Sequence, residues 1–429
     1  MKSRIALVSS GNRYVSFTAI AQLILKAGQE LGTTQLFAVD PNTPESLGFQ
    51  CNRSNHLLKT NAHLAVGLEL FRPDVIIYYY DLFPANIYLD TICKYCSRHE
   101  KRCMAYLPID GLPHKPFFLD PFSKVDKLVF FHEVFQKQVT SMTQSEKQYL
   151  QFANVEMGSI HHPVPTSNIC NLKLSSTEKN QTLRRLVNDW RGNSHSICIL
   201  NGNRCVSRKR MDITILAFEK LLEEGRVDSY LFLHRVRFQD FFNLYPHVEL
   251  KPNIRKRIYF QDDFTSKTFL TEHQLNSLYN CCEIGVNTAS GEGWGLVSSE
   301  HAKTGASQVT SGSTTFRTIW QHFALHGTIE YCRDSDRIYG IGEEVCSVHS
   351  IVKQLKKLCL NSTLRKRQSN LALLFAQEEM PDTKSFVNLW SHEIKSQCKA
   401  IKGTHLRGRE KQQRVQRKSS SFLWNKTSW

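Results

Sequence analysis

The stretch of sequence that decides the fold is ICILNGNRCVSRKRMDITILAFE, residues 197–219. It opens on ICIL, a short β-branched and apolar run that predicts a buried strand. A polar loop rich in Lys and Arg follows, and from about residue 209 the apolar residues recur at helical spacing. Strand, loop and amphipathic helix in this order make a βα unit, the repeating element of a doubly wound parallel sheet.

The same alternation continues along the second half of the chain and predicts one sheet there. Its strands are expected at Ile197–Asn201, Tyr230–His234, Ile258–Gln261, Ile284–Asn287, Gln308–Thr310 and Ile329–Cys332. Helices are expected at Lys209–Glu224, Glu272–Asn280, Leu296–Thr304 and Val348–Leu360.

The first half of the chain predicts another sheet of the same kind. Its strands are expected at Ile5–Ser9, Gln35–Asp40, Val75–Tyr80, Cys103–Leu107, Lys127–Phe131 and Val155–Ile160. We therefore expect an α/β protein with two Rossmann-like, doubly wound domains. The expected parts are a first domain over 1–167, a connector over 168–193 with a helix around Thr182–Trp190, a second domain over 194–382, a helix over 383–400 that crosses back to the first domain, and a tail over 401–429.

Composition supports a folded protein. The chain has 429 residues, of which 41% are hydrophobic and 22% charged, which excludes a disordered or collagen-like chain. Its thirteen cysteines are an odd number in mostly apolar settings, which favours reduced, buried thiols. No apolar run reaches the roughly 18 residues that span a bilayer, so we expect a cytoplasmic protein.

The positive charge is unevenly distributed. The whole chain carries +16, and residues 401–429 hold eight Lys or Arg against the single Glu410, which is +7. This tail lacks apolar periodicity, and we expect it to be disordered. It is either solvated or makes a peripheral contact with an anionic membrane surface or another polyanion.

Four cations lie in the loop of the quoted stretch: Arg204, Arg208, Lys209 and Arg210. A loop between a strand and a helix presents backbone N–H groups and the positive end of the helix dipole. Arg204 and Lys209 add two formal charges, so the loop suits a phosphate-bearing ligand. The alternatives are that these residues are merely solvated or contact a nucleic-acid backbone.

A second stretch, IGVNTASGEGWGLVSSE at residues 284–300, follows the same plan. Three glycines within five residues let the backbone approach a ligand and supply N–H donors at a helix start. Glu292 lies in this loop and Glu300 about two helical turns further on, so the two carboxylates are not expected to share a proton. Because carboxylates accept hydrogen bonds from vicinal hydroxyls, the pair suggests a sugar beside one and a ribose beside the other.

Other motifs are absent or incomplete. The glycine spacing is not the GxGxxG of dinucleotide sites, and no GxxxxGK[ST] occurs, so hydride transfer and P-loop chemistry lose support. Asp262 and Asp263 resemble a metal-binding pair without a third ligand nearby and are interpreted as a solvated turn. No metal site is predicted.

Taken together, the two motifs resemble the retaining glycosyltransferases of family 4, which have the GT-B fold. Arg204 and Lys209 follow the first strand of a second domain, and Glu292 and Glu300, in and after GEGWGL, are separated by seven residues. The helix-then-strand segment LNSLYNCCEIGVN, residues 275–287, precedes the glutamate loop as it does in family members. The resemblance is strong over about 197–313 and implies two domains that face each other across a cleft.

The resemblance implies roles for residues of the second domain. Arg204 and Lys209 would hold the diphosphate of a nucleotide-sugar donor. Glu292 would contact hydroxyls of the donor sugar, and Glu300 would hold the ribose. Backbone amides would line the phosphate and the sugar, from Gly293, Trp294, Gly295 and Leu296.

In the first domain, Gly11 lies in the first strand-to-helix loop, which approaches the donor phosphate in similar enzymes. Asp110, within LPIDGLP at residues 107–113, lies where many relatives carry a histidine near the transferred sugar. It is a candidate catalytic helper, and His114 and His132 are alternatives to it.

The resemblance implies a glycosyltransferase that moves a sugar, with retention of configuration and without metal or other cofactor, onto a glycan or a lipid- or protein-linked sugar. Breaking the bond from the anomeric carbon to phosphate adds negative charge to the diphosphate, which Arg204 and Lys209 are placed to stabilise. One such preorganised group contributes ~3 kcal/mol, roughly a hundredfold in rate. The alternatives are a nucleotide-sugar epimerase and a non-catalytic binder of sugar nucleotides or polyanions, with nucleic acid not expected as a partner.

Overall fold

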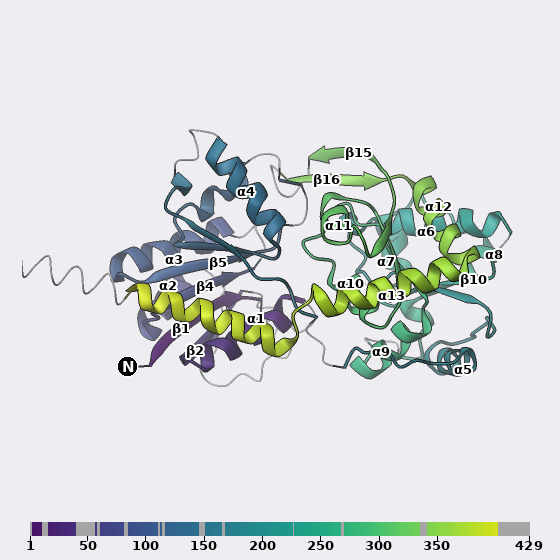
Figure 1. The fold of residues 1–429 in the computed structure, drawn as a ribbon, viewed down its shortest axis with the longest axis horizontal. Helices are drawn as coiled ribbons and strands as arrows, with labels where there is room; N and C mark the ends of the chain where they lie inside the picture. The colour runs from purple at the N-terminus through teal and green to yellow at the C-terminus, as the bar shows by residue number, and fades with distance from the viewer. Residues whose placement is uncertain are drawn as a thin grey trace, which may run out of the picture.

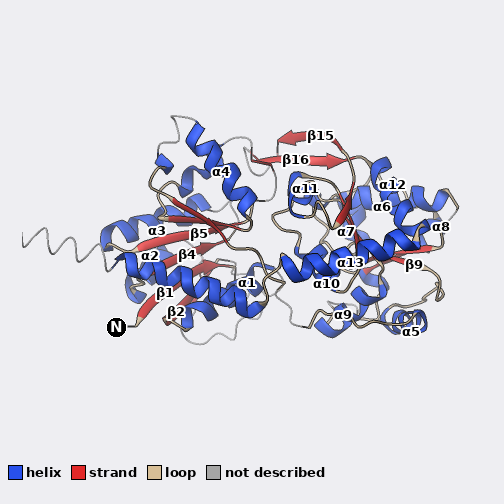
Figure 2. Cartoon of the chain, viewed as in Figure 1, coloured by secondary structure: helices blue, strands red, loops and turns tan. Residues whose placement is uncertain are grey.

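The computed structural model describes residues 2–10, 16–39, 56–57, 61–80, 85–109, 112–113, 116–145, 151–164, 168–225, 227–266, 270–334 and 341–401. Two parallel sheets with helices around them form two domains that lie end to end (Figures 1 and 2). A small antiparallel sheet is the third sheet. The predicted fold class, two Rossmann-like α/β domains, is therefore confirmed.

The first domain contains a seven-stranded sheet in the order β3-β2-β1-β4-β5-β7-β8, with all neighbours parallel. The strands are β1 (Ser3–Ser9), β2 (Gly32–Ala38), β3 (His56–Leu57), β4 (Val75–Tyr79), β5 (Arg102–Leu107), β7 (Lys127–Phe130) and β8 (Glu156–Ser159). The helices are α1 (Ser16–Gln29), α2 (Asn61–Phe71), α3 (Ala85–His99) and α4 (Glu133–Ser145), with a 3₁₀ segment at Pro116–Phe122. The central strand β4 is buried along its whole length, as expected for a sheet covered on both faces.

The second domain contains a six-stranded parallel sheet in the order β11-β10-β9-β12-β13-β14. Its strands are β9 (Ile197–Leu200), β10 (Ser229–Leu233), β11 (Ile258–Phe260), β12 (Ile284–Asn287), β13 (Ser307–Thr310) and β14 (Ala324–His326). Its helices are α5 (Ser176–Leu186), α6 (Met211–Glu223), α7 (Phe238–Leu244), α8 (Pro252–Arg255), α9 (Glu272–Cys281), α10 (Leu296–Lys303), α11 (Thr314–Ile319), α12 (Val348–Leu360) and α13 (Ser362–Glu378). Short 3₁₀ segments lie at Ser207–Lys209 and Gln261–Asp263.

One predicted strand of the second sheet is wrong. The segment Ile329–Cys332 lies in β15 (Ile329–Asp334), which pairs antiparallel with β16 (Ile341–Cys346) instead of joining the parallel sheet. The sixth place in the parallel sheet belongs to β14, just before it. Residues 330–333 are all exposed, so this hairpin strand meets solvent on both faces, unlike the buried strands of the parallel sheet.

The hairpin also contacts the first domain. Strand β16 pairs antiparallel with the two-residue strand β6 (Leu112–Pro113), with Ile341 opposite Pro113 and Gly342 opposite Leu112. The three strands β15, β16 and β6 form the small sheet, and its hairpin lies above α11 in Figure 1. Backbone pairing therefore links the two domains directly.

Residues 383–401 form a final helix that packs on the first domain, the yellow helix of Figure 1. Trp390 is fully buried, with its ring centroid 5.1 Å from that of Tyr106 in β5. Glu393 forms an ion pair with Lys127 at 2.9 Å, and the Ser391 hydroxyl donates to the Ala27 carbonyl at 3.2 Å. The chain thus ends its described part on the domain where it began.

The segment before the second sheet packs on the second domain. Helix α5 begins earlier than the sequence predicts, because Ser175 and Glu178 form a capping box at its start. Its Leu183 and Leu186 join a buried cluster with Tyr230 of β10. The helix α13 was not predicted from the sequence.

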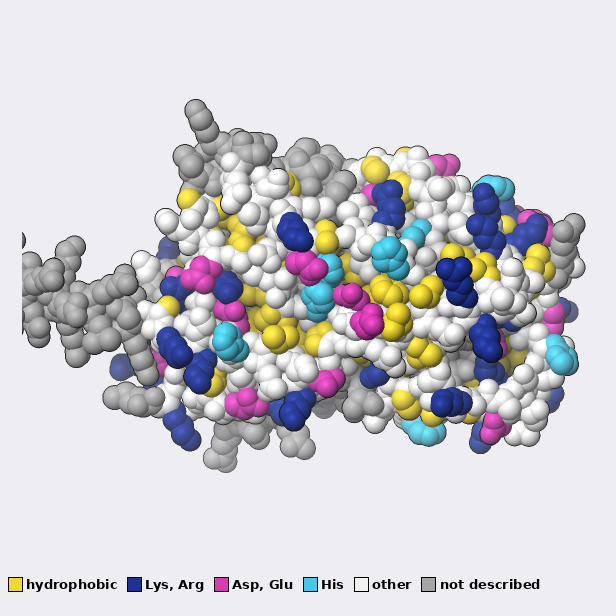
Figure 3. Space-filling model, in the orientation of Figure 1, with side chains coloured by type: hydrophobic (Ala, Val, Ile, Leu, Met, Phe, Trp, Pro, Cys, Tyr) yellow, Lys and Arg dark blue, Asp and Glu magenta, His cyan; other side chains and the backbone are white. Residues whose placement is uncertain are grey.

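Surface charge on the face in Figure 3 is mixed, with Lys and Arg scattered over both domains among Asp and Glu. The twelve cysteines in the described part of the chain are free. A search of the same residues finds no helix that is both long and apolar enough to cross a membrane. Of the basic tail, Ile401 is described, and residues 402–429 lie outside the described residues.

Candidate active site

The two predicted motifs lie side by side at the carboxyl ends of β9 and β12, which are parallel neighbours. Ser290 donates its backbone N–H to the Arg208 carbonyl at 2.9 Å, and its hydroxyl donates to the same oxygen at 3.1 Å. The Thr288 hydroxyl donates to the Arg210 carbonyl at 2.8 Å. The cationic loop and the glutamate loop, residues 288–295, are therefore joined through their backbones.

Glu292 is buried at the contact between the two loops, with 7% of its surface exposed. Lys209 forms an ion pair with its Oε1 atom, and the Asn287 side-chain amide donates to the same oxygen at 3.3 Å. Arg208 lies 3.6 Å from its Oε2 atom and also donates to the Gly291 carbonyl. Two cations therefore surround one buried carboxylate.

The environment of Glu292 has two opposing effects on the pKa of its carboxyl. Burial by itself raises the pKa of this carboxyl. The charges of Lys209 and Arg208, with the hydrogen bonds from Lys209 and Asn287, outweigh burial and hold the pKa below its ordinary value. Glu292 is thus a buried carboxylate anion that depends on its cations.

Among the cations of the first loop, Arg208 and Lys209 contact the glutamate loop. Arg204, predicted to share the diphosphate with Lys209, lies in the same loop with an exposed side chain. Arg210 has a left-handed backbone, with φ 47°, and forms an ion pair with Asp212 at 2.7 Å. Arg210 occupies the N-cap position of α6 without a side-chain capping hydrogen bond, and its guanidinium binds Asp212.

Sequence reasoning noted Arg208 but assigned it no role. A 3₁₀ turn over Ser207–Lys209 places Arg208 and Lys209 against the same carboxylate. A turn of this kind has no clear sequence signal, so the spacing of the cations alone did not reveal it.

The glutamate loop ends in a tight turn into α10. Gly295 has φ 84°, a left-handed conformation, and a Cβ atom there would lie 3.1 Å from Phe316 Cε1. Glycine is the residue that adopts this conformation without strain. The predicted backbone donors of Gly293, Trp294, Gly295 and Leu296 accordingly lie in the loop and at the start of α10, where free N–H groups are expected.

Glu300 lies on α10 and has partners different from those of Glu292. The buried Tyr279 donates its hydroxyl to Glu300 at 3.1 Å. Burial raises the pKa of Glu300, while Arg235 and the Tyr279 hydroxyl partly offset this shift. Among the described residues, Glu292 is bound by Lys209, Arg208 and Asn287, and Glu300 by Tyr279.

Trp294 is buried at the contact between the domains. Its ring centroid lies 6.1 Å from that of His132 and 5.6 Å from that of His161, both in the first domain. One apolar cluster accordingly runs from the first sheet through Trp294 to Trp320 and Phe375. The Trp294 side chain is therefore part of the domain interface.

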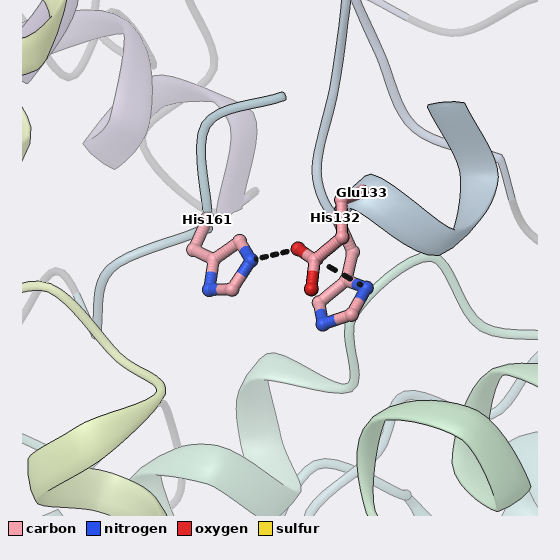
Figure 4. Close-up of side chains that lie close together, drawn as sticks. All are labelled: His132, Glu133 and His161. Atoms are coloured by element: carbon pink, nitrogen blue, oxygen red, sulfur yellow. Dashed lines mark hydrogen bonds and ion pairs between the residues drawn. The ribbon is translucent and has the colours of Figure 1, made fainter. Parts of the chain in front are cut away.

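His132, Glu133 and His161 form a cluster (Figure 4). Both histidine rings lie near the Trp294 ring. His161 Nε2 lies 2.6 Å from a Glu133 carboxylate oxygen, and His161 Nδ1 lies 3.1 Å from the Glu379 carbonyl at the end of α13. Burial lowers the pKa of His132 to about 4, with His161 contributing in the same direction.

The three side chains of this cluster offer ligand atoms within 4.8 Å of one another. However, the His132 and His161 rings are stacked nearly parallel, 13° apart with centroids at 4.5 Å. A metal ion binds in the plane of an imidazole ring, so one ion cannot lie in both planes in this arrangement. The Val134 backbone N–H also donates to His132 Nδ1 at 3.2 Å, which engages that atom. We assign the cluster to domain contact.

Three predicted site residues lie outside the described residues: Gly11, Asp110 and the alternative His114. Their roles stay predictions. His132, the other alternative to Asp110, is described and belongs to the cluster above.

No protein-family model matches this sequence, and no curated protein matches it closely enough to count as a relative. Solved structures do match. Sucrose-phosphate synthase from Thermosynechococcus elongatus has a TM-score of 0.65 at 10% identity, covering 93% of this chain and 100% of that one. α,α-Trehalose 6-phosphate synthase from Burkholderia multivorans has a TM-score of 0.65 at 12% identity, covering 94% and 99%.

A third match is Anabaena HepE, solved in complex with UDP-glucose. It has a TM-score of 0.62 at 10% identity and covers 92% of this chain and 100% of that one. At such identities the likeness concerns the fold. The two parallel-sheet domains of this chain, matched over nearly their whole length, have the GT-B fold.

Proposed function

We propose that this protein is a retaining GT-B glycosyltransferase of the family 4 type. It transfers a hexose from a nucleotide-sugar donor to a glycan or glycoconjugate acceptor. The observation that carries the proposal is the buried Glu292 held by Lys209 and Arg208 at the carboxyl ends of β9 and β12. The fold supports it, since HepE was solved with UDP-glucose and two other matches are named as sucrose- and trehalose-phosphate synthases.

In the structure, Glu292 is the counter-ion of Lys209. A diphosphate brings two or more negative charges to the same loop. Lys209 and Arg208 then bind phosphate oxygens, and Glu292 becomes available to accept hydrogen bonds from the sugar hydroxyls. Because the cations are already positioned, little of their binding energy is lost to ordering.

The same cations favour bond cleavage. When the bond from the anomeric carbon to the phosphate oxygen breaks, the electron pair stays on the diphosphate and its negative charge rises. Lys209 interacts more strongly with that charge in the transition state than in the ground state, which contributes ~3 kcal/mol per group. Exposed Arg204 is proposed to assist from the outer side of the loop.

Glu300 is proposed to hold the ribose. Its carboxylate already accepts one hydrogen bond, from the Tyr279 hydroxyl at 3.1 Å, and has further lone pairs for ribose hydroxyls. The Gly293–Leu296 amides are proposed to contact the phosphate and sugar at the start of α10.

Retention of configuration follows from attack on the face that the diphosphate leaves. In this proposal the leaving phosphate oxygen takes the proton of the acceptor hydroxyl, so no protein nucleophile is needed. Asp110 of the first domain is the proposed helper. The first domain binds the acceptor.

The test is incubation of the purified chain with UDP-glucose, and in parallel with other nucleotide hexoses, in the presence of a panel of glycan acceptors. Nucleoside diphosphate release that depends on acceptor, with an α-linked product from an α-linked donor by NMR, is the expected result. Glu292→Gln should lower turnover about a hundredfold. Lys179→Ala is the matched control, because Lys179 forms an ion pair with Glu283 at 2.8 Å in the same domain but contacts neither loop in the interactions described.

Two results would redirect the assignment. Donor consumption that needs no acceptor and yields an epimeric sugar indicates an epimerase. Binding that survives Glu292→Gln and falls steeply between about 50 and 200 mM salt indicates a polyanion binder without catalysis.

A further inference from the structure

Strand β16 touches both halves of the proposed active site. Its first residues, Ile341 and Gly342, pair with β6 of the first domain, which begins two residues after Asp110 in the sequence. Two residues further along β16, the Glu344 backbone N–H donates to the Ser290 carbonyl at 2.8 Å. One strand therefore connects the glutamate loop with β6 of the first domain.

The Glu344 side chain makes a second connection. It is almost fully buried, with 3% exposed, and accepts the Thr314 backbone N–H at 2.5 Å. Its other oxygen binds Arg317 at 3.1 Å. Ser313, the residue before α11, makes no side-chain cap, so Glu344 supplies the acceptor that the first turn of α11 needs.

Helix α11 in turn holds the glutamate loop. The Thr315 hydroxyl donates to the Glu292 carbonyl at 2.5 Å. Glu344 thus acts on the loop at two points, through its own N–H to Ser290 and through α11 to Glu292. These points are the Ser290 carbonyl, two residues before Glu292, and the carbonyl of Glu292 itself, whose carboxylate binds Lys209.

We infer that Glu344 is a positioning residue, and that β16 couples the order of the glutamate loop to the position of β6 in the first domain. The inference rests on the proposed function for its catalytic meaning. The coupling itself is a property of the chain without ligand. Loss of the Glu344 carboxylate should loosen the glutamate loop and weaken the alignment of the donor with the first domain.

The neighbouring Glu343 is a matched control. It lies on the same strand, and its carboxylate binds Arg333 of β15 at 2.9 Å within the hairpin. Its described contacts reach neither the glutamate loop nor α11. Glu343→Ala therefore removes a carboxylate from β16 while leaving the two connections of Glu344 in place.

The first experiment is amide hydrogen exchange on the full chain without ligand, comparing Glu344→Ala with Glu343→Ala. The expected result is faster exchange, by tenfold or more, in peptides covering both 288–295 and 102–113 for Glu344→Ala, and less than a twofold change for Glu343→Ala. Tenfold corresponds to 1.4 kcal/mol, close to the smallest loss expected for one hydrogen bond to a charged group. Exchange that changes only in the hairpin and α11 would overturn the coupling.

Glu344→Gln provides a second variant if the alanine variant does not fold. The glutamine amide oxygen can still accept the Thr314 N–H, but the side chain has no negative charge to pair with Arg317. Exchange in both peptides is expected to be faster than in the wild type. If Glu344→Ala does not fold and Glu344→Gln exchanges at the wild-type rate in both peptides, the role of the carboxylate is overturned.

The second experiment measures transfer and donor hydrolysis separately, with UDP-glucose as the probe. A residue that only stabilises the fold changes both rates in proportion. A positioning residue lowers transfer more than hydrolysis, so Glu344→Gln should raise the ratio of hydrolysis to transfer at least threefold while Glu343→Ala leaves it unchanged. An unchanged ratio contradicts the inference. If the wild type consumes no nucleotide sugar, the proposed function fails, and the exchange experiment alone then decides the coupling.

Discussion

Removal of the Lys209 ammonium should destabilise the protein as well as stop catalysis. In Lys209→Ala the buried Glu292 loses its ion-pair partner. Breaking a buried pair in this way costs about 3–5 kcal/mol. Glu292 keeps Arg208 at 3.6 Å and the Asn287 amide at 3.3 Å, so we expect a smaller cost of about 2 kcal/mol. For a domain of this size that is a fall in Tm of roughly 4–8 °C.

The loss should depend on pH in a defined direction. In the wild type the Glu292 pKa lies below its ordinary value, so its contribution to stability is present above about pH 4.5 and is lost as pH falls through the lower folded pKa. In Lys209→Ala burial dominates and should raise that pKa. The destabilisation is then full at neutral pH and shrinks as Glu292 takes up a proton toward pH 4.5.

Thermal melts at pH 7.5 and pH 5.0 measure both effects, and the double variant Lys209→Ala with Glu292→Gln is the control. The double variant should recover most of the lost stability, because the buried charge is gone. Lys179→Ala breaks a more exposed pair and should cost about 1 kcal/mol or less. An equal Tm for Lys209→Ala and wild type at pH 7.5, or a loss that the double variant does not reduce, would refute the account of Glu292 as an anion dependent on its cations.

Three further predictions follow from the fold and the site. Gly295→Ala should destabilise the protein by about 1–2 kcal/mol in urea unfolding, because φ is 84° and the new Cβ would lie 3.1 Å from Phe316; a change below 0.3 kcal/mol would contradict it. Trp390→Ala should cost about 3–5 kcal/mol, since the ring is fully buried against Tyr106, and calorimetry that shows no loss would detach the last helix from the first domain. Burial lowers the pKa of His162 and of His234 to about 3, so unfolding takes up protons at these sites; stability should fall by about 1.4 kcal/mol per histidine and pH unit below pH 6.5, and a Tm unchanged between pH 7 and pH 5 would exclude this.

The parallel sheets were predictable because their strands are buried on both faces and read as continuous apolar runs. The strand at Ile284–Asn287 was predicted with the bounds that it has in the structure. The hairpin strand β15 was misassigned because a short apolar run does not reveal which sheet it joins. Helix α13 was missed because few of its residues are buried, among them Ala372 and Phe375, so its apolar stripe is narrow.

The part of the site that depends on residue types and their spacing was predictable from the sequence. The sequence placed a cationic loop and a glutamate loop at neighbouring strand ends, and the structure joins them through Ser290 and Arg208. It assigned the diphosphate to Arg204 and Lys209 and did not predict that Arg208 also lies against Glu292, because that contact depends on a 3₁₀ turn. It also did not predict Glu344, which acts from a strand that sequence reasoning did not assign.

The most direct test of the central claim is a calorimetric titration of UDP-glucose, with other nucleotide hexoses in parallel, into the wild type, Lys209→Ala and Lys179→Ala. The account predicts binding of at least one donor by the wild type and by Lys179→Ala, with affinity at least tenfold weaker in Lys209→Ala. Equal affinity in all three proteins, or no binding of any nucleotide sugar by the wild type, would contradict it.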